Sequence, residues 1–581
     1  MVLGRIFKAL LVSLLLAASA YGVAKLNLFG LESASDELAD GVYQRITAAD
    51  YGADRRGQSQ VSVVYLDESS MEAMKGFGWG HFPPTYEQQT QMYDDVLSVG
   101  GAPPSAVYAD YVYTGEGGAN EGWPAFLAEI AKATHADAWR GAPACQADPL
   151  TKIACIEASG GVPMIFAKPS PAEVDIFTDV QRQLDKVAVM SPALVNALAY
   201  PMVWRYPFDA AAARARGVDG FDISPALALY AAYCLHQADA CGIADFAALR
   251  RRARAALAGK PLAPVDVTRT FDGPLSVVWG SRPDPDYLTM TRNVTGQDAP
   301  CRKPRGHWLV RLGEQMANLR GPGTDAHQEC PYALTLGYDR IVAGLGLQQS
   351  DLKRLLAGKL VLLGGQFRAS NDWVESPVQG EAPGVHFHAM AIDNLIEDGA
   401  NYRRSSSQLI DSDLFKSLLI AGMAFCGVMG VMARNSLLDR AVETRAEAKL
   451  RARVYGPLYF GIFGASVGVV IAATLFGVRV LHRAPINWIG ITAVVLGFLF
   501  YATRETLPAD ILGSVEHLRW VKRSMAAIRL FRQHLKFEED RLVTRRTQRS
   551  ATPAEGAEPA QPAPPAARNE SPKEAPAHVQ T

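Results

Sequence analysis

Residues 358–399 read GKLVLLGGQFRASNDWVESPVQGEAPGVHFHAMAIDNLIEDG and contain the pattern around which we expect the chain to fold. The aliphatic run 360–363 is short and ends at Gly364, which predicts a buried strand followed by a turn. A polar loop comes next, and then a segment with an apolar face, for which we predict a helix from near Ala389 to Gly399. These are the parts with which an α/β domain builds a ligand-facing edge.

Strand and helix patterns alternate over the preceding 300 or so residues. We predict strands at 61–66, 106–113, 162–167, 275–279 and 360–363, and helices at 86–96, 123–133, 225–235 and 246–257. This alternation predicts an α/β domain with a mostly buried sheet and flanking helices.

The chain has 581 residues, which is too long for one ordinary domain. Its formal net charge of -1 lacks the basic excess of a dedicated nucleic-acid binder, so we expect no nucleic-acid partner. Lysine and arginine instead gather at the extreme N-terminus, around 434–453 and across 504–549, each time beside an apolar segment. That clustering is typical of an integral membrane protein with basic cytoplasmic flanks.

Four segments are apolar enough to span a lipid bilayer, so the membrane is an expected partner. They cover residues 9–24, 414–433, 454–478 and 486–502, each close to the roughly 20 residues that a spanning helix requires. The first comes after Arg5 and Lys8 and contains Ala18-Ser19-Ala20, so it fits a cleaved signal peptide as well as an uncleaved anchor. Either alternative exports the region that begins near residue 31.

The basic clusters also predict the topology. They place the 434–453 loop and the C-terminus in the cytoplasm, and residues 31–410 and the 479–485 turn outside. We therefore expect a 1–30 anchor or signal peptide, a 31–410 exported domain, three spans within 411–503 forming an α-helical membrane domain, a basic amphipathic helix within 504–549 and a disordered tail at 550–581. The expected location is a bacterial inner membrane with the exported domain in the periplasm.

Six of the seven cysteines lie in the exported region, which favours an oxidising compartment: Cys145, Cys155, Cys234, Cys241, Cys301 and Cys330. Several pairings are open, and the simplest joins nearest neighbours, 145 with 155, 234 with 241 and 301 with 330. The absence of a Cys-x-x-Cys pair argues against a zinc or thioredoxin-like site. We expect no metal and no cofactor.

An amphipathic helix is predicted at 510–537. Its apolar residues recur at a mean step of about 3.4, close to the coiled-coil repeat of roughly 3.5: Ile511, Val515, Leu518, Val521, Met525, Ile528, Phe531 and Leu535. Such a seam fits a second copy of the same helix, which would give a homodimer. It also fits the inner leaflet, where anionic lipid would attract the basic side chains.

The 358–399 segment resembles the C-terminal end of the second class of CHASE domains, the cyclase/histidine-kinase-associated sensory extracellular domains. That family has a hydrophobic strand ending in a glycine turn, an Asp, a Pro, and a Pro-Gly-Val-x-x-His-Ala stretch followed by Asn-Leu in a helix. The matching residues are Gly364, Asp372, Pro377, Pro383-Gly384-Val385, His388-Ala389 and Asn394-Leu395. The resemblance implies a membrane sensor whose first segment stays as an anchor.

The N-terminal half is similar to the same family. Residues 61–67 and 106–110 look like its first two strands, each of which ends in an acidic residue. Trp79 and Pro83-Pro84 match its Trp/Pro-rich turn, but the basic residue that often comes after this turn is not obvious here. The resemblance covers about 31–405 and is weak through 115–330.

Asp67 and Asp110 each close a predicted strand, so both are expected at one edge of the sheet. With Asp372 and His388 they could form a polar-ligand or metal site, since carboxylate and imidazole are common ligands. Strand-end carboxylates also cap the next turn or helix, and His388 could bond a loop carbonyl. We take these four residues as ligand-binding candidates and assign no catalytic residue and no metal ligand; His386 and His388 would share a face only if they lie on a strand.

In the family that this chain resembles, such a module usually precedes a cyclase, kinase or histidine-kinase output domain. Only about 80 residues come after residue 502, too few for an enzyme domain. We therefore expect a sensor that is not an enzyme and that signals to a separate kinase or cyclase partner through 510–537. The alternative is a cell-envelope enzyme or structural factor that acts through the exported domain.

Overall fold

A computed structural model describes residues 31–404 with gaps, and scattered positions within 7–18, 420–425 and 464–478 and at 482 and 491. The gaps in the main range are 53–55, 80–81, 114–120, 169–178, 193–199, 206–220, 238–240, 242, 261–268, 296–329, 343–346 and 368–371. The chain divides into two compact units, residues 1–437 with 460–503 and residues 438–459 with 504–581. All described residues belong to the first unit.

Some of the predicted features involve residues outside the described part of the chain. These are most of the four predicted spans, the 510–537 helix, the 550–581 tail and Cys301. Within the residues that are described, no helix combines the length and the apolar character needed to cross a membrane.

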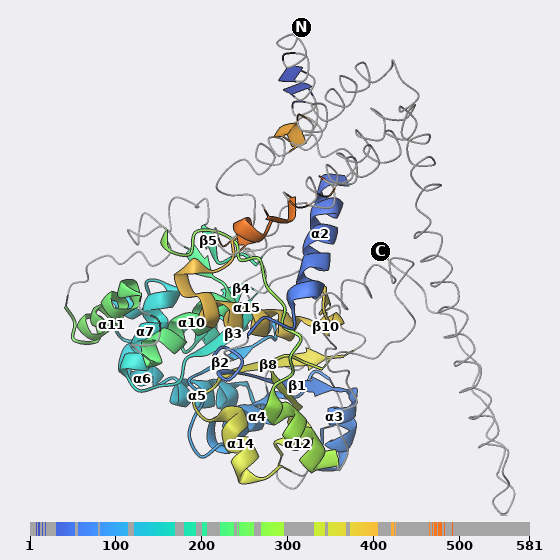
Figure 1. Cartoon of the computed structure of the whole chain (residues 1–581). Helices are drawn as coiled ribbons and strands as arrows, with labels where there is room; N and C mark the ends of the chain where they lie inside the picture. The colour runs from blue at the N-terminus through green and yellow to red at the C-terminus, as the bar shows by residue number, and fades with distance from the viewer. Residues whose placement is uncertain are drawn as a thin grey trace, which may run out of the picture. The chain divides into compact units, whose positions relative to one another are not determined.

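Six strands form one sheet in the order β4-β3-β2-β8-β1-β7, and every neighbouring pair is parallel (Figure 1). The strands are β1 (Val61–Asp67), β2 (Ala106–Ala109), β3 (Met164–Lys168), β4 (Val189–Pro192), β7 (Leu334–Gly337) and β8 (Leu360–Gln366). Their side chains are buried on both faces, as is typical of a parallel sheet that helices cover on two sides. The central strand β8 is the last of the six in the sequence and lies between β1 and β2.

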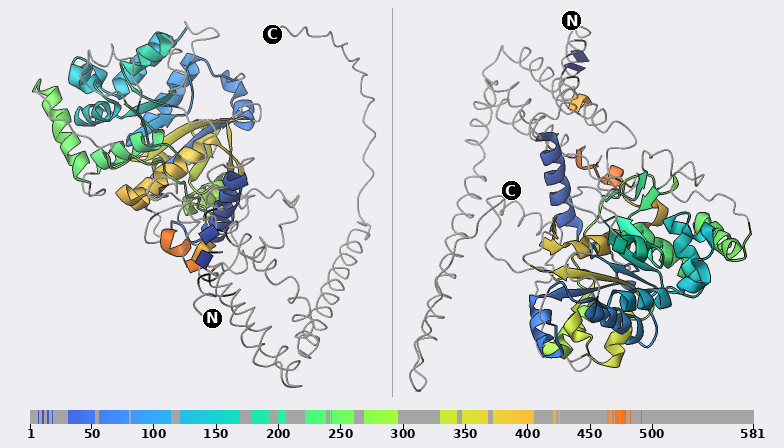
Figure 2. Two further views of the ribbon diagram at one scale, coloured as in Figure 1. Left: turned by 90° about the horizontal axis from the view of Figure 1, so that it is seen from above. Right: turned by 180° about the vertical axis from the view of Figure 1, so that it is seen from behind.

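Helices cover both faces of this sheet: α7, α10 and α15 lie on one side and α4, α5 and α14 on the other (Figure 1 and Figure 2). The helices are α2 (Leu31–Thr47), α3 (Glu68–Ala73), α4 (Tyr86–Ser98), α5 (Trp123–Ala133), α6 (Ala136–Trp139), α7 (Pro149–Ala158), α8 (Asp179–Asp185), α10 (Pro225–His236), α11 (Ala244–Leu257), α12 (Pro285–Thr295), α14 (Gln349–Leu356) and α15 (Gly384–Asp398). Two antiparallel hairpins add β5 (Val203–Arg205) with β6 (Phe221–Ile223), and β9 (Trp373–Ser376) with β10 (Gly380–Pro383).

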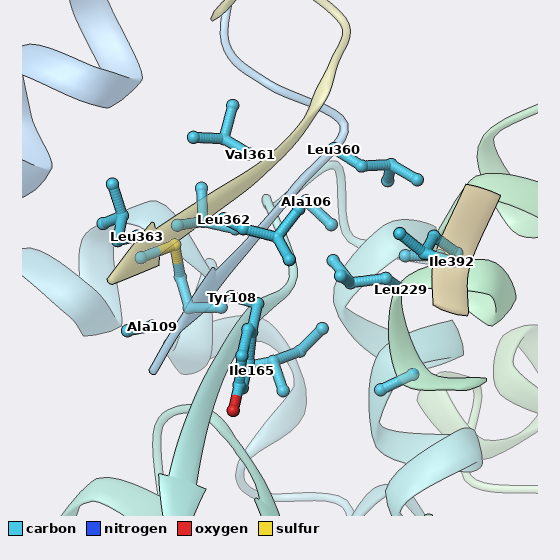
Figure 3. Close-up of a cluster of buried hydrophobic side chains, with 14 of the residues drawn as sticks. Ala106, Tyr108, Ala109, Ile165, Leu229, Leu360, Val361, Leu362, Leu363 and Ile392 are labelled. Atoms are coloured by element: carbon cyan, nitrogen blue, oxygen red, sulfur yellow. The ribbon is translucent and has the colours of Figure 1, made fainter. Parts of the chain in front are cut away.

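Part of the core lies where β2, β3 and β8 meet α10 and α15 (Figure 3). Leu362 of β8, Leu229 of α10 and Ile392 of α15 are all fully buried there. Helix α10 is buried on every side from Pro225 to Leu235, which explains why it is apolar all round rather than amphipathic.

The predicted α/β class is confirmed, and the expected strands at 61–66 and 162–167 match β1 and β3. The expected strand at 106–113 is shorter and ends at Ala109. The strand predicted at 275–279 is wrong, because only Leu275 forms a β-bridge. The backbone beyond it is bonded by side chains instead: Val278 N–H donates to Asn394 Oδ1 at 2.7 Å, and Trp279 N–H donates to Gln44 Oε1 at 3.2 Å.

The helix predicted from Ala389 begins five residues earlier, at Gly384. Gly364 of β8 permits this early start, because a Cβ there would lie 2.6 Å from the Cβ of Val385. Consequently His386 and His388 lie on a helix and not on a strand, so their side chains diverge by about 200°.

Candidate functional site

The cluster of candidate residues lies at the carboxyl ends of the central strands. The chain runs from β1 through β2 and β3 to β4 at one edge of the sheet, and then resumes with β7 at the other edge. Strand β8 is inserted between β1 and β2, so its carboxyl end lies beside theirs at the middle of the sheet. In open α/β sheets, ligands bind outside the carboxyl ends of the strands.

Asp110 comes directly after β2 and is fixed by its N–H, which donates to the Leu363 carbonyl at 2.8 Å. The Tyr108 hydroxyl donates to Asp110 Oδ1 at 2.8 Å. Asp110 Oδ2 has no hydrogen-bond partner among the described residues, although the side chain is only 9% exposed. It lies 3.7 Å from His388 Nε2, which is too far for a hydrogen bond.

The Tyr200 hydroxyl determines which ring nitrogen of His388 carries the proton. The Tyr200 hydroxyl accepts the Ala226 N–H at 3.1 Å, so its own proton is available for His388 Nδ1 at 2.7 Å. A neutral His388 then holds its proton on Nε2, facing Asp110. Burial lowers the pKa of His388 to about 4, outweighing the opposite effect of Asp372, so the ring is neutral at physiological pH.

Asp372 reaches the same place from the loop before β9. Its carbonyl accepts the Gly384 N–H at 2.9 Å, and Gly384 makes room for its carboxyl, because a Cβ there would overlap Asp372 Oδ1. Burial and then the charge of Asp110 raise the pKa of Asp372 to about 7, and His388 opposes this. Burial also raises the pKa of Asp110 to about 6, against the hydrogen bond from Tyr108.

Asp67 does not join this cluster. Its carboxylate accepts the Ser70 N–H at 2.6 Å and the Ser69 hydroxyl at 2.9 Å, which makes it the N-cap of α3. Because β8 separates β1 from β2, the strands that carry Asp67 and Asp110 are about 10 Å apart. The structure thus brings Asp110, Asp372 and His388 together and gives Asp67 a capping role.

His386 is also buried, and burial lowers its pKa to about 4. It stays apart from His388 because the two lie on different faces of α15. In the described part of the chain, no group of three or more His, Cys, Asp or Glu residues is placed to hold a metal ion.

An aromatic rim, which we define as Phe82, Tyr111 and Phe367, borders the cluster. The Phe82 and Phe367 rings are 4.0 Å apart, and Phe82 is 47% exposed. Tyr111 lies beside Gly365 near Phe367, and both Asp110 and Asp372 contribute to raising its pKa. The rim therefore offers apolar surface next to the two carboxyl groups.

The sequence prediction missed two hydroxyl partners of the cluster. Tyr108 precedes Asp110 by two residues, so the alternation of a strand could have placed both on one face. Tyr200 comes from a segment 188 positions before His388, and no local pattern links the two.

A second buried carboxyl, Asp393, was also missed. The Tyr51 hydroxyl donates to Asp393 Oδ2 at 2.6 Å, and Asn394 Nδ2 donates to that hydroxyl at 2.7 Å. Burial raises the pKa of Asp393 to about 8, so this group is mainly protonated at neutral pH. It joins the loop before β1 to α15, and its hydrogen-bond partners differ from those of the Asp110 cluster, although His388 lies on the same helix.

The structure contains the disulfides Cys145–Cys155 and Cys234–Cys241, which are two of the nearest-neighbour pairs expected from the sequence. Cys330 is disulfide-bonded as well. The first joins the short 3-10 helix Pro143–Gln146 to α7, and the second joins α10 to the bend that comes after it.

Residues 11–431 match the family model of the CHASE2 domain. No curated protein and no solved structure is similar enough to match the chain. CHASE2 is a family of sensory extracellular domains, and the matched range includes the whole described α/β domain with its carboxyl cluster. This chain therefore belongs to the CHASE2 domain family.

Proposed function

We propose that this protein is a multi-pass membrane sensor whose exported CHASE2 domain signals to a separate kinase or cyclase partner. The observation that carries this proposal is the extent of the family match, residues 11–431. That range includes the α/β domain together with most of the apolar segments 9–24 and 414–433 that flank it. A sensory extracellular domain between two membrane segments is the arrangement that exposes a ligand site outside and connects it to the inside.

Two contacts support the proposed topology. Disulfides such as Cys145–Cys155 persist in oxidising compartments, as expected for an exported domain. In addition, the Arg404 N–H donates to the carbonyl of His482 at 3.1 Å. His482 belongs to the 479–485 turn, so its contact with the domain supports a turn on the same side of the membrane as the domain.

We infer that the Asp110–Asp372–His388 cluster is the sensory site and that the domain does not catalyse a reaction. Among the described contacts of His388 are the rings of Tyr108, Tyr200 and Phe387, and none of its described contacts is a serine or cysteine nucleophile. The burial of ionisable groups at the carboxyl ends of the central strands instead favours recognition of a ligand.

The proposal is tested by asking whether a change at the site reaches the far end of the chain. Val521→Cys, in a background carrying Cys426→Ser, gives one reactive thiol in the 510–537 helix. We expect Asp110→Asn to change the rate at which a maleimide labels that thiol in inverted membrane vesicles. The matched control is Asp67→Asn, which alters the same residue type at the same sheet edge and keeps a good N-cap.

If Asp110→Asn and Asp372→Asn both leave the labelling rate unchanged in a folded protein, the domain does not signal through this helix and the sensor proposal is wrong. Labelling that succeeds only from the periplasmic side would also contradict it, because the helix would then lie outside.

A further inference from the structure

The Asp110 carboxylate has an acceptor atom that the described part of the protein does not use. Oδ1 receives the Tyr108 hydroxyl, whereas Oδ2 receives no hydrogen bond although the side chain is more than nine-tenths buried. An unsatisfied buried carboxylate oxygen is costly, and each such atom in a folded protein calls for a physical explanation. Oδ2 lies 3.7 Å from His388 Nε2, and the charge of Asp110 acts on Asp372, so a ligand atom bound among these groups could satisfy it.

The charges around this atom indicate what kind of ligand would satisfy it. Asp110 comes directly after β2 and Asp372 lies in the loop before β9, and the charge of Asp110 disfavours the charge of Asp372. The titratable groups that face them are His388 of α15 and the tyrosines Tyr108, Tyr111 and Tyr200. Burial keeps the histidine and the tyrosines neutral, so none of them supplies a positive charge.

No lysine or arginine within the described ranges forms an ion pair with either carboxylate. Two buried acids with no basic partner among the described residues are neutralised by a proton or by a cation. Hydrogen bonds between a cationic donor and a carboxylate are roughly twice as strong as neutral ones, so a cationic ligand would gain more here than a neutral hydroxyl.

The surface next to the carboxyls distinguishes an organic cation from a metal ion. The described residues place no group of three His, Cys, Asp or Glu ligands for a metal. The aromatic rim instead presents the Phe82 ring, which is tilted against Phe367 and 47% exposed, and Phe367 and Tyr111 both lie near Gly365. Aromatic faces hold the apolar part of a ligand and also attract a cation.

We propose that the Asp110–Asp372 pair binds the protonated amino group of a small organic amine, whose apolar part packs against the aromatic rim. The proposal rests on the proposed function, because it names the ligand class of the sensory site. The ammonium would donate to Asp110 Oδ2 and to the carboxyl of Asp372. Tyr108 and Tyr200 would hold Asp110 and His388 in position through the hydrogen bonds already present.

The first experiment uses the full chain purified in detergent micelles and two probes of nearly the same shape. The probes are 2-phenylethylamine, which carries a positive charge, and 2-phenylethanol, which is neutral. We expect isothermal titration to show binding of the amine and at least about tenfold weaker binding of the alcohol, the loss that corresponds to a hydrogen bond to a charged group.

The pH dependence gives an independent readout. The amine stays protonated up to its own pKa, close to that of lysine, whereas Asp110 and Asp372 ionise near pH 6 to 7. Amine affinity should therefore rise as the pH increases from about 6 to about 8. Alcohol affinity that equals amine affinity, or amine affinity that does not change over this range, would overturn the proposal.

Variants locate the binding. Asp110→Asn should weaken amine binding about tenfold or more, because it removes the charge and keeps the shape. Asp372→Asn provides the same test if Asp110→Asn does not fold. Phe82 is exposed, and Phe82→Ala should weaken amine binding without changing the pH dependence of that binding. Asp67→Asn is the matched control and should bind the amine like the wild type.

Failure of this inference can be told apart from failure of the proposed function. If no amine binds, or if binding ignores Asp110 and Asp372, the ligand class is wrong. The labelling rate at residue 521 can still respond to Asp110→Asn in that case, and the sensory site would then stand with a different ligand. If binding occurs as expected and the labelling rate never responds, the amine site stands and the sensor proposal fails.

Discussion

Arg403 Nη2 lies 2.7 Å from Asp40 Oδ1, so one ion pair joins α2, where the described domain begins, to the segment where it ends. The Arg403 guanidinium also lies over the Tyr43 ring, 5.4 Å from its centroid. The Arg403 carbonyl accepts the Ser276 N–H at 2.8 Å. The two ends of the domain, which lead toward the first and second predicted spans, are thus held together.

This ion pair should contribute measurably to stability. Arg403 is only 5% exposed and Asp40 is 29% exposed, so Asp40→Ala leaves a buried guanidinium without its carboxylate. We expect Asp40→Ala to lower the free energy of unfolding by about 2 to 3 kcal/mol. This is less than the usual cost of breaking a fully buried ion pair, because Asp40 is partly solvated. Chemical denaturation of the full chain measures this.

The control is Glu72→Ala, which breaks the exposed Lys75–Glu72 pair. It should change stability by less than about 1 kcal/mol. Equal effects of the two substitutions would show that the Arg403–Asp40 pair has no special role.

Asp393 should make the folded state less stable as the pH rises. Its pKa is raised to about 8 in the folded state and is about 3.9 in an unfolded chain, so the folded state binds the extra proton between these values. The stabilisation that Asp393 contributes is therefore fully present at the low end of this window and is lost as the pH rises through about 8. His386 and His388 affect the pH dependence of stability only below about pH 6.5, because their pKa values in the folded state are lowered.

The clean window for the measurement is thus about pH 6.5 to 8.5. Asp393→Asn mimics the protonated carboxyl and should flatten the fall of Tm across this window in part. Asp372 also has a raised pKa and therefore contributes to the fall of Tm with pH, and this contribution remains in the Asp393→Asn variant. A variant that retains the full wild-type slope would rule out Asp393 as a source of it.

The disulfides should be intact in protein isolated from membranes. Non-reducing peptide mapping is expected to recover the pairs Cys145–Cys155 and Cys234–Cys241, together with a pair that joins Cys301 and Cys330. Replacing Cys145 and Cys155 by serine should cost about 2 to 3 kcal/mol, the value for closing a loop of this length. Free thiols at either position in the wild type would count against an exported domain.

The predicted topology is checked with reporter fusions. Because lysine and arginine stay on the cytoplasmic side, reporters placed after Arg445 and after Arg523 should both be cytoplasmic. A reporter placed after Arg404 should be external. An external signal from either of the first two positions would disprove the four-span arrangement.

The 510–537 helix is expected to self-associate rather than lie on the leaflet, because its apolar step is close to the coiled-coil repeat. Exposing about eight large apolar side chains to water would cost on the order of 10 kcal/mol, so the seam requires a partner. Replacing Val521, Met525 and Ile528 by Asp should abolish cross-linking between copies and leave membrane insertion intact. Cross-linking that survives this triple change would favour the lipid-bound alternative.

Local sequence patterns predicted a strand correctly where the spacing of apolar residues matches the burial of that strand in the fold. The aliphatic run at 360–363 indicated β8 because a strand buried on both faces has no polar alternation to obscure it. The run at 275–279 is similarly apolar, yet it forms no strand, because distant side chains such as Asn394 and Gln44 bond its backbone. Composition cannot distinguish these two outcomes, since the partner of a backbone group is a tertiary property.

The candidate site was predictable in part for the same reason. Asp110 and Asp372 come after strands that end at one edge, so their proximity is expected from parallel pairing alone. Asp67 satisfies the same rule and still lies elsewhere, because strand order cannot be derived from strand positions along the chain. The insertion of β8 between β1 and β2 separates Asp67 from the other residues.

That insertion also constrains how the protein can be made. The sheet cannot form at its centre until residue 366 has been synthesised, because β1 and β2 do not pair with each other and each pairs with β8. Over about 250 residues of synthesis, two apolar strand edges stay unpaired, and such edges invite association with other chains. We expect the nascent domain to depend on chaperones during export, and truncations that end before β8 to aggregate instead of folding in part.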